Sequence, residues 1–187
     1  MRITIDLDDF TDERINLLNP LLKLKEIIPN LKITLFCIPK GTSDLIAKKI
    51  LSYGFFELAQ HGWVHNLYEC KNLLYQEAID MLEAGHRDYF VRGFKAPNWL
   101  YSHAMLKVLK ENNYWAAIHP KQVEFAKKIG VKTYLYSQAI DGDWRAETIH
   151  ATGHVQKCVC KDSIEECWLN LLRLPKDAEY KFISEVV

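Results

Sequence analysis

The sequence has no excess of charge of either sign, no long hydrophobic run and no Gly/Ser-rich linker. Its 187 residues include 24 Lys and Arg and 24 Asp and Glu, so the formal net charge is zero. Without a basic excess the chain lacks the electrostatic footprint of a nucleic-acid-binding protein. No segment is long and apolar enough for a transmembrane helix, and no basic start precedes an apolar stretch as in a signal peptide. We therefore expect a cytoplasmic protein without a nucleic-acid partner.

The cysteines also form no informative pattern. The five cysteines are odd in number and irregularly spaced, and only Cys158 and Cys160 are close neighbours. This excludes a disulfide framework and a CxxC zinc site, and it favours reduced structural thiols. A composition with 49% hydrophobic residues is typical of a globular protein. With no linker or repeat to divide it, the chain is predicted to be one domain, residues 1–187.

Short β-rich runs alternate with helical patterns along the whole chain. Regular alternation of this kind predicts βαβ units and a parallel sheet, and the number of units favours a barrel. The length is short for a complete (β/α)8 barrel of about 250 residues, so we expect a distorted, incomplete TIM-like barrel. The expected strands are RITIDL, KITLFCI, FFELAQ, FVRGFKAP, YWAAI, VKTYLYS, ETIHATGHV and a last run KFISEVV, and the expected helices cover residues 15–28, 42–53, 73–89, 102–113, 123–128 and 163–172.

Reactive side chains follow nearly every one of these strands. In a parallel barrel the carboxyl ends of the strands converge on one rim, where active sites of this architecture are built. A random distribution would scatter such residues over both rims. The residues concerned are Asp8 and Asp9, His61 and His65, Pro97 to Trp99, His119, Asp141 and Asp143, and His154.

Two of these groups together suggest a metal site. His61 and His65 are four residues apart, and such a pair can bind one cation. A carboxylate from Asp8 or Asp9 completes a set of two nitrogens and one oxygen, which leaves positions open for water and substrate on zinc or a related divalent ion. Of two adjacent carboxylates, one can bind the cation while the other accepts a proton from water.

The ordered motifs resemble those of the polysaccharide deacetylases, the NodB-homology family that includes carbohydrate esterase family 4. The resemblance implies a distorted (β/α)7 barrel and metal-dependent removal of an acetyl group from an N-acetylated, or alternatively O-acetylated, carbohydrate. The match covers residues 3 to 155. The motifs that carry it are Asp8-Asp9, His61-x-x-x-His65, Lys95-Ala96-Pro97, Asp143-Trp144 and Gly153-His154-Val155.

The resemblance also assigns roles to individual residues. It implies that Asp8 is the general base and that Asp9, His61 and His65 bind one divalent ion, with zinc expected and cobalt, nickel or manganese as alternatives. Lys95 stands where the family has an Arg that holds the base, and it offers a point charge instead of a planar fork.

The late motif supplies a general acid. We choose His154 for this role, with Asp143 as its partner and His150 as the alternative acid. The candidate substrate-binding residues are Pro97, Asn98, Trp99 and Trp144, because aromatic faces and amides suit sugars.

The predicted function is thus that of a metal-dependent carbohydrate deacetylase, a hydrolase acting on an N-acetylated sugar or oligosaccharide. Two other hypotheses stay open at this point. The replacement of Arg by Lys95 suggests a non-catalytic sugar- or metal-binding homologue, and the same ligand types also serve other mononuclear metal hydrolases.

Overall fold

A computed structural model describes residues 1–156 and 163–187 of the chain, so Cys158 and Cys160 lie outside the described residues. The described strands are β1 (Arg2–Phe10), β2 (Ile33–Cys37), β3 (Phe56–His61), β4 (Gly93–Lys95), β5 (Trp115–Ile118), β6 (Lys132–Leu135), β7 (Gln138–Ala139), β8 (Thr148–His154) and β9 (Glu179–Lys181). The described α-helices are α1 (Asn19–Ile27), α2 (Asp44–Ser52), α3 (Tyr75–Gly85), α4 (His103–Glu111), α5 (Val123–Ile129) and α6 (Ile164–Leu171).

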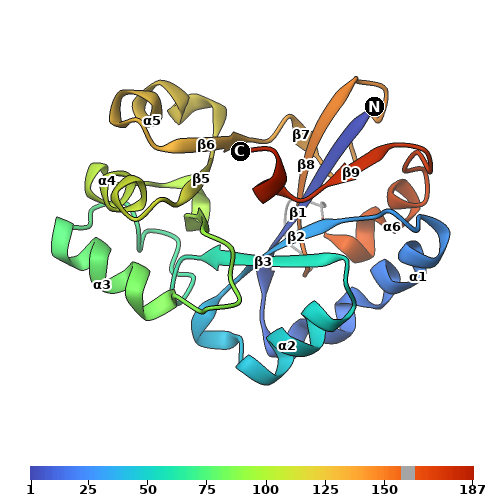
Figure 1. The fold of residues 1–187 in the computed structure, drawn as a ribbon, viewed down its shortest axis with the longest axis horizontal. Helices are drawn as coiled ribbons and strands as arrows, with labels where there is room; N and C mark the ends of the chain where they lie inside the picture. Colours follow the sequence, from blue (N-terminus) through green and yellow to red (C-terminus); the bar gives the residue numbers. More distant parts are fainter. Residues whose placement is uncertain (157–162) are drawn as a thin grey trace.

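The strands form one parallel sheet that curls into part of a barrel (Figure 1). Their order is β6-β5-β4-β3-β2-β1-β8-β7, and β9 pairs with the beginning of β1. Among the described strands, β6 and β7 are the two ends of this order and do not pair with each other. The expected distorted, incomplete barrel is therefore confirmed. None of the helices in the described ranges is long and apolar enough to cross a membrane.

The expected elements are present, with three differences. The helix expected over residues 15–28 is divided into a 3-10 helix (Asp12–Leu18) and α1, because Pro20 lacks an N–H and is accepted only in the first turn of an α-helix. The two-residue strand β7 was not predicted. In the last run, KFISEVV, only Lys181 belongs to a strand, and a 3-10 turn (Ile183–Glu185) follows.

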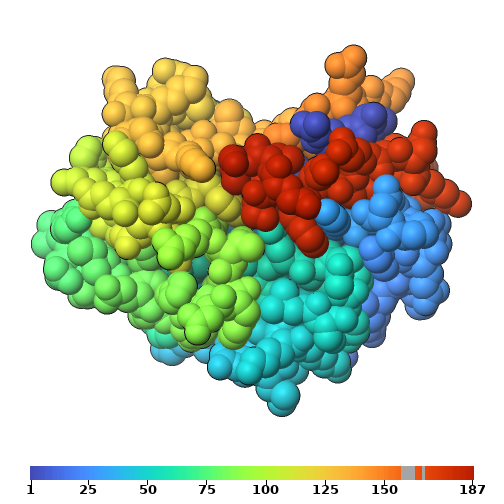
Figure 2. Space-filling model, in the orientation of Figure 1, coloured from blue at the N-terminus to red at the C-terminus, as the bar shows by residue number. Residues whose placement is uncertain are grey.

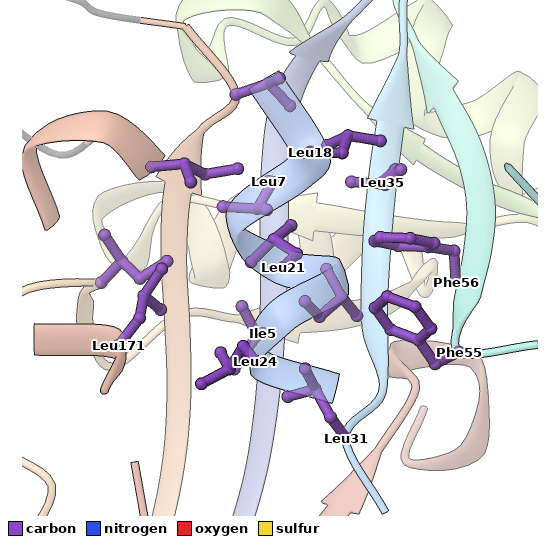
Figure 3. Packing of buried hydrophobic residues seen from close by; sticks show 14 of the residues in the cluster. Ile5, Leu7, Leu18, Leu21, Leu24, Leu31, Leu35, Phe55, Phe56 and Leu171 are labelled. Atoms are coloured by element: carbon purple, nitrogen blue, oxygen red, sulfur yellow. The ribbon is translucent and has the colours of Figure 1, made fainter. Parts of the chain in front are cut away.

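The outer face of the sheet is apolar and is covered by helices. Alternate side chains of β1, including Ile5 and Leu7, are fully buried in a cluster with Leu21 and Leu24 of α1. Figure 3 shows these leucines of α1 directed at β1 and β2. Burying each such side chain stabilises the fold by about 1.5 to 3 kcal/mol. This packing fixes β1, so the other side chains of β1 must face the inside of the barrel.

The C-terminal residues close the lower part of that interior. Ile183 packs with Phe36, Trp115 and Tyr134 in a cluster inside the curled sheet. In Figure 1 the C-terminal turn lies in the middle of the sheet's concave side, and Figure 2 shows the same red segment filling the space between the parts around α4 and α1. The interior of the curled sheet is thus filled by apolar side chains at the amino ends of the strands, and polar groups remain at their carboxyl ends.

Buried polar bonds hold this closing turn in place. The Ser184 amide and hydroxyl donate to the Glu57 carboxylate, and the Ile183 amide donates to Thr34 Oγ1 over 3.1 Å. Thr34 Oγ1 in turn donates to Glu57 Oε1 over 2.6 Å. Burial raises the pKa of Glu57, although the hydrogen bonds from Ser184 and Thr34 oppose this.

Candidate metal centre and active site

A column of polar side chains runs up the inner face where β1 meets β8. The register pairs Thr4 with His150, Asp6 with Thr152 and Asp8 with His154. In parallel strands, residues paired in this way lie on the same face of the sheet. Strand pairing therefore brings the predicted base Asp8 beside the predicted acid His154 at the carboxyl end of the column.

Asp9, His61 and His65 form a compact cluster at this end of the barrel. Asp9 Oδ1 lies 3.2 Å from His61 Nε2 and 2.8 Å from His65 Nε2. The three ligand atoms lie within 4.8 Å of one another and could hold a metal ion. One carboxylate and two imidazoles match the donor set of a divalent ion such as zinc, which keeps a position open for water.

The backbone turns sharply at Asp9 to place its side chain in the cluster. The register of β1 against β2 shifts between Leu7 and Phe10, and Asp9 has a φ of 67°. A residue other than glycine rarely adopts a positive φ. Where one does, the surrounding structure must hold it there, and such residues cluster at functional sites. Arg14 donates to the Asp9 carbonyl, and Gln156 Nε2 donates to Asp9 Oδ2 over 3.0 Å. The turn therefore sends the neighbouring carboxylates of Asp8 and Asp9 in different directions.

The imidazole of His61 is fixed by a bond on its far side. His61 Nδ1 donates to the Lys95 carbonyl over 2.9 Å, which leaves Nε2, the atom that faces Asp9, as the ring atom that a metal ion would bind. Second bonds of this kind set the tautomer and orientation of metal-binding histidines in general. The ring is 3% exposed, which shields this bond from water.

The loop that presents His65 is organised by Glu69. The Glu69 carboxylate accepts hydrogen bonds from the amides of Trp63, Val64 and His65 over 2.9 to 3.2 Å. Gly62, which precedes this loop, has a φ of 57°, and a Cβ there would overlap Glu69 Oε1. Gly62 is therefore needed for both its backbone conformation and its lack of a side chain.

The pKa values within the cluster reflect these contacts. Burial raises the pKa of Asp9, but the hydrogen bonds and charges of His61 and His65 outweigh this and lower it far below its usual range. The hydrogen bond to Asp9 raises the pKa of His65. Asp9 is therefore ionised at neutral pH, as a metal-binding carboxylate must be.

Lys95 lies between two carboxylates just inside the cluster. Its Nζ is 2.7 Å from Asp6 Oδ2 and 2.7 Å from Asp8 Oδ1, and it also donates to Thr152 Oγ1 over 2.9 Å. Thr152 Oγ1 donates to the same Asp6 oxygen, and Lys95 is only 1% exposed. Burial lowers the pKa of Lys95, but the charges of Asp6 and Asp8 outweigh this and raise it. Lys95 is thus a buried cation that holds Asp8.

Trp99 covers this buried cation. Its ring centroid is 4.1 Å from Lys95 Nζ, close enough for a cation–π interaction. Pro97 is buried, and Asn98 is exposed with a φ of 53°. Of the four predicted substrate-binding residues, Trp99 contacts Lys95 directly, and Pro97 and Asn98 precede it in the same 3-10 turn (Pro97–Trp99).

The two candidate histidines on β8 have different surroundings. His150 Nδ1 donates to the Leu135 carbonyl over 2.8 Å, and its ring stacks on Tyr134 at 5.0 Å. It pairs with Thr4, four residues before Asp8, which is about 13 Å along a strand. His154 pairs with Asp8 itself. Of the two candidates, His154 is thus the one that strand pairing places beside Asp8.

The structure does not bring Asp143 and Trp144 to this site. Asp143 forms an ion pair of 2.8 Å with Arg145, in a hollow that also includes Arg173, beyond the C-terminal end of α6. His154 instead forms a β-bridge with Ser163, the residue just before α6. The eight-residue helix, about 12 Å long, therefore separates His154 from the hollow that contains Asp143. Trp144 packs against the outer hydrophobic cluster. Both residues lie in the connection between β7 and β8, whose path the motif pattern did not reveal.

Comparisons with known proteins bear on this arrangement. No protein-family model and no curated protein matches the sequence. Among solved structures, a family 4 acetyl xylan esterase from Clostridium thermocellum in complex with a cobalt ion is similar, with a TM-score of 0.63, 15% identity, and coverage of 99% of this chain and 89% of that chain. The chain has the fold of the family 4 carbohydrate esterases. The expected likeness to the polysaccharide deacetylases is thereby confirmed at the level of fold.

Of two further similar structures with the family 4 fold, one is of a deacetylase and the other is of a pseudoenzyme. A peptidoglycan deacetylase from Bacillus subtilis matches with a TM-score of 0.62 and 15% identity, covering 98% of this chain and 88% of that chain. A family 4 pseudoenzyme from Bacillus anthracis matches with a TM-score of 0.61 and 16% identity, covering 99% of this chain and 64% of that chain. The fold is thus shared by proteins with and without activity, and the function must be argued from the site.

Proposed function

We propose that this protein is a metal-dependent carbohydrate deacetylase that acts on an N-acetylated sugar. The observation that carries the proposal is the position of the Asp9, His61 and His65 cluster directly beside the buried pair of Asp8 and Lys95. Zinc is the expected ion, and cobalt, the ion in the Clostridium esterase structure, is the first alternative. When bound, such an ion polarises the acyl carbonyl and lowers the pKa of water.

The remaining steps belong to the side chains of this chain. Asp8, held by Lys95 at 2.7 Å, takes a proton from the attacking water as general base. His154, beside Asp8 across the β1 and β8 pairing, gives a proton to the departing sugar amine, which would otherwise leave poorly. Lys95 restricts Asp8 to one orientation. The ring of Trp99 above Lys95 keeps water away from that ion pair.

Variants of adjacent carboxylates give a sharp test. Purified protein loaded with zinc or cobalt should bind one ion per chain and release acetate from a panel of N-acetylated sugars and oligosaccharides. Asp8→Asn should keep the ion and lower kcat by about 10² to 10⁴-fold. Asp9→Asn should weaken metal binding by more than the roughly 100-fold that loss of an outer-shell partner costs.

Asp12 offers a matched control in the same stretch. Its Oδ1 accepts a bond from the Ser43 amide over 2.9 Å, outside the cluster, so Asp12→Asn should change neither metal content nor rate. A wild-type protein that binds no divalent ion would contradict the proposal. So would one that binds the ion but releases no acetate from any member of the panel.

A non-catalytic sugar-binding role is the second candidate. Lys95 in place of the family's Arg and the similarity to a pseudoenzyme favour it. It predicts sugar binding without acetate release, unchanged in Asp8→Asn. Isothermal titration with the same sugars separates the two functions.

A further inference from the structure

Exposed apolar side chains gather in the loop that joins β3 to α3. Among the described residues eleven large hydrophobic side chains are exposed, and five of them fall within residues 64–75. Single exposed hydrophobic side chains are normal on a protein surface, but a group of them marks a site that contacts a protein or a membrane. The five are Val64, Leu67, Tyr68, Leu74 and Tyr75, which are 43 to 71% exposed.

Hydrogen bonds hold this loop in place along its length. The Glu69 carboxylate accepts from three backbone amides near its beginning. The Cys70 carbonyl accepts from the amide of Ser102, the residue before α4, over 2.7 Å. At the end of the loop, the Leu74 amide donates to Glu77 over 2.7 Å. The loop is thus bonded at its beginning, middle and end, and its apolar side chains stay outside the core.

A basic face of α4 continues this apolar loop. The Tyr75 hydroxyl donates to Glu111 of α4 over 2.5 Å, and Lys107 Nζ lies 5.1 Å from the centroid of the Tyr75 ring. In Figure 1, α3, α4 and α5 lie next to one another at one side of the molecule. Between α4 and α5 is a hollow of about 540 Å³, whose lining includes His103, Lys107, Lys110, Glu111, Phe125 and Lys128. We call residues 64–75 and the side chains lining this hollow the apolar–basic surface.

This surface is positively charged, although the formal net charge of the whole chain is zero. Four lysines belong to it, and Glu111, which lies 3.9 Å from Lys107, is the one carboxylate in the lining of the hollow. The other carboxylate of the surface, Glu69, is occupied by backbone amides. Among the described residues no carboxylate forms an ion pair with the remaining three lysines, which are Lys71, Lys110 and Lys128.

We propose that the apolar–basic surface docks the protein on a bilayer that contains anionic phospholipid. Binding of this kind combines burial of apolar side chains with attraction between lysines and lipid phosphates. Tyrosine suits the boundary between the two, because its ring is apolar and its hydroxyl is polar. A protein partner fits less well, since protein interfaces are enriched in Arg and depleted in Lys, whereas this surface has four lysines and no arginine. The inference is independent of the deacetylase function.

Co-sedimentation of the zinc-loaded protein with vesicles is the measurement. One set of vesicles is phosphatidylcholine alone, and the other contains about one-third phosphatidylglycerol, whose charge the lysines should recognise. The wild type should bind the mixed vesicles at least about tenfold more tightly than the neutral ones, and added salt should weaken this binding. Leu74→Ser should lower the partition coefficient about tenfold, and Lys110→Gln about fivefold.

Helix α2 offers matched controls away from this surface. Leu45 is 77% exposed, against 71% for Leu74, and Lys49 is exposed like Lys110. Leu45→Ser and Lys49→Gln should therefore leave the partition coefficient at its wild-type value. All of these side chains are exposed, so the circular dichroism spectra of the variants should match that of the wild type.

Four results would overturn the inference. The first is that the wild type does not bind the mixed vesicles. The second is that Leu45→Ser weakens binding as much as Leu74→Ser does, which means adsorption without a defined surface. The third is that Lys110→Gln weakens binding but Leu74→Ser does not, which means that the surface attracts polyanions in general. The fourth is a wild-type dimer in size-exclusion chromatography that Leu74→Ser separates into monomers, which makes a second copy the occupant.

Discussion

Lys95 should be essential to the stability of the fold. It is 1% exposed and lies 2.7 Å from both Asp6 and Asp8, so Lys95→Met leaves two buried carboxylates without a counter-charge. Breaking a buried ion pair by removing one partner costs about 3 to 5 kcal/mol. For a domain of this size each kcal/mol corresponds to about 2 to 4 °C, so the melting temperature should fall by about 6 to 20 °C.

Urea unfolding followed by circular dichroism measures this loss. Lys107→Met is the matched control, because Lys107 is half exposed and lies 3.9 Å from Glu111, and it should change the free energy of unfolding by less than about 0.5 kcal/mol. Asp6→Asn combined with Lys95→Met should cost less than the sum of the two single changes, by about 0.5 to 3 kcal/mol, since both act on one network.

Two results would refute this reasoning. One is a free energy of unfolding for Lys95→Met within about 1 kcal/mol of the wild type. The other is strict additivity of the two substitutions, which would mean that Asp6 and Lys95 do not interact energetically. Either result would contradict the view that the buried ammonium of Lys95 holds Asp8 in place.

Three other predictions concern different parts of the structure. His154→Gln should lower kcat in acetate-release assays by about 10² to 10⁴-fold. His150→Ala should mainly lower the melting temperature, because His150 packs on Tyr134 away from Asp8. The opposite pattern would make His150 the acid. Gly62→Ala should lower the free energy of unfolding in urea by at least about 1 to 2 kcal/mol, because Gly62 has a positive φ. It should also weaken zinc binding in a chelator competition, because the new Cβ displaces Glu69 and with it His65. Unchanged zinc affinity would contradict this. Because the folded pKa of Glu57 is raised, its ionisation destabilises the fold as pH rises above about 4.5. As the pH rises above about 4.5, the free energy of unfolding of the wild type should therefore fall relative to that of Glu57→Gln. If the two proteins show the same dependence of this free energy on pH, Glu57 does not titrate as argued.

Several features of the site could be predicted because they depend on residues close in sequence. The adjacent pair Asp8 and Asp9 and the spacing of His61 and His65 place ligand-type side chains at strand ends whatever the rest of the chain does. The structure brings Asp9, His61 and His65 together as expected. The part played by Asp6 was missed, although one signal was available. Thr4, Asp6 and Asp8 alternate with apolar residues, which puts all three on the inner face.

The sequence by itself determined the alternation of strands and helices, and with it the parallel, incomplete barrel and the rim on which reactive residues gather. These follow from hydrophobic periodicity, which is a local property. Only the tertiary structure decided which strands are neighbours and where each connection runs. Pairing of β1 with β8 put His154 beside Asp8, and the path between β7 and β8 carried Asp143 away. Contacts of this kind join residues far apart in the sequence, since Lys95 is 89 positions from Asp6 and 57 from Thr152, and Thr152 is 146 from Asp6, and no local pattern encodes them.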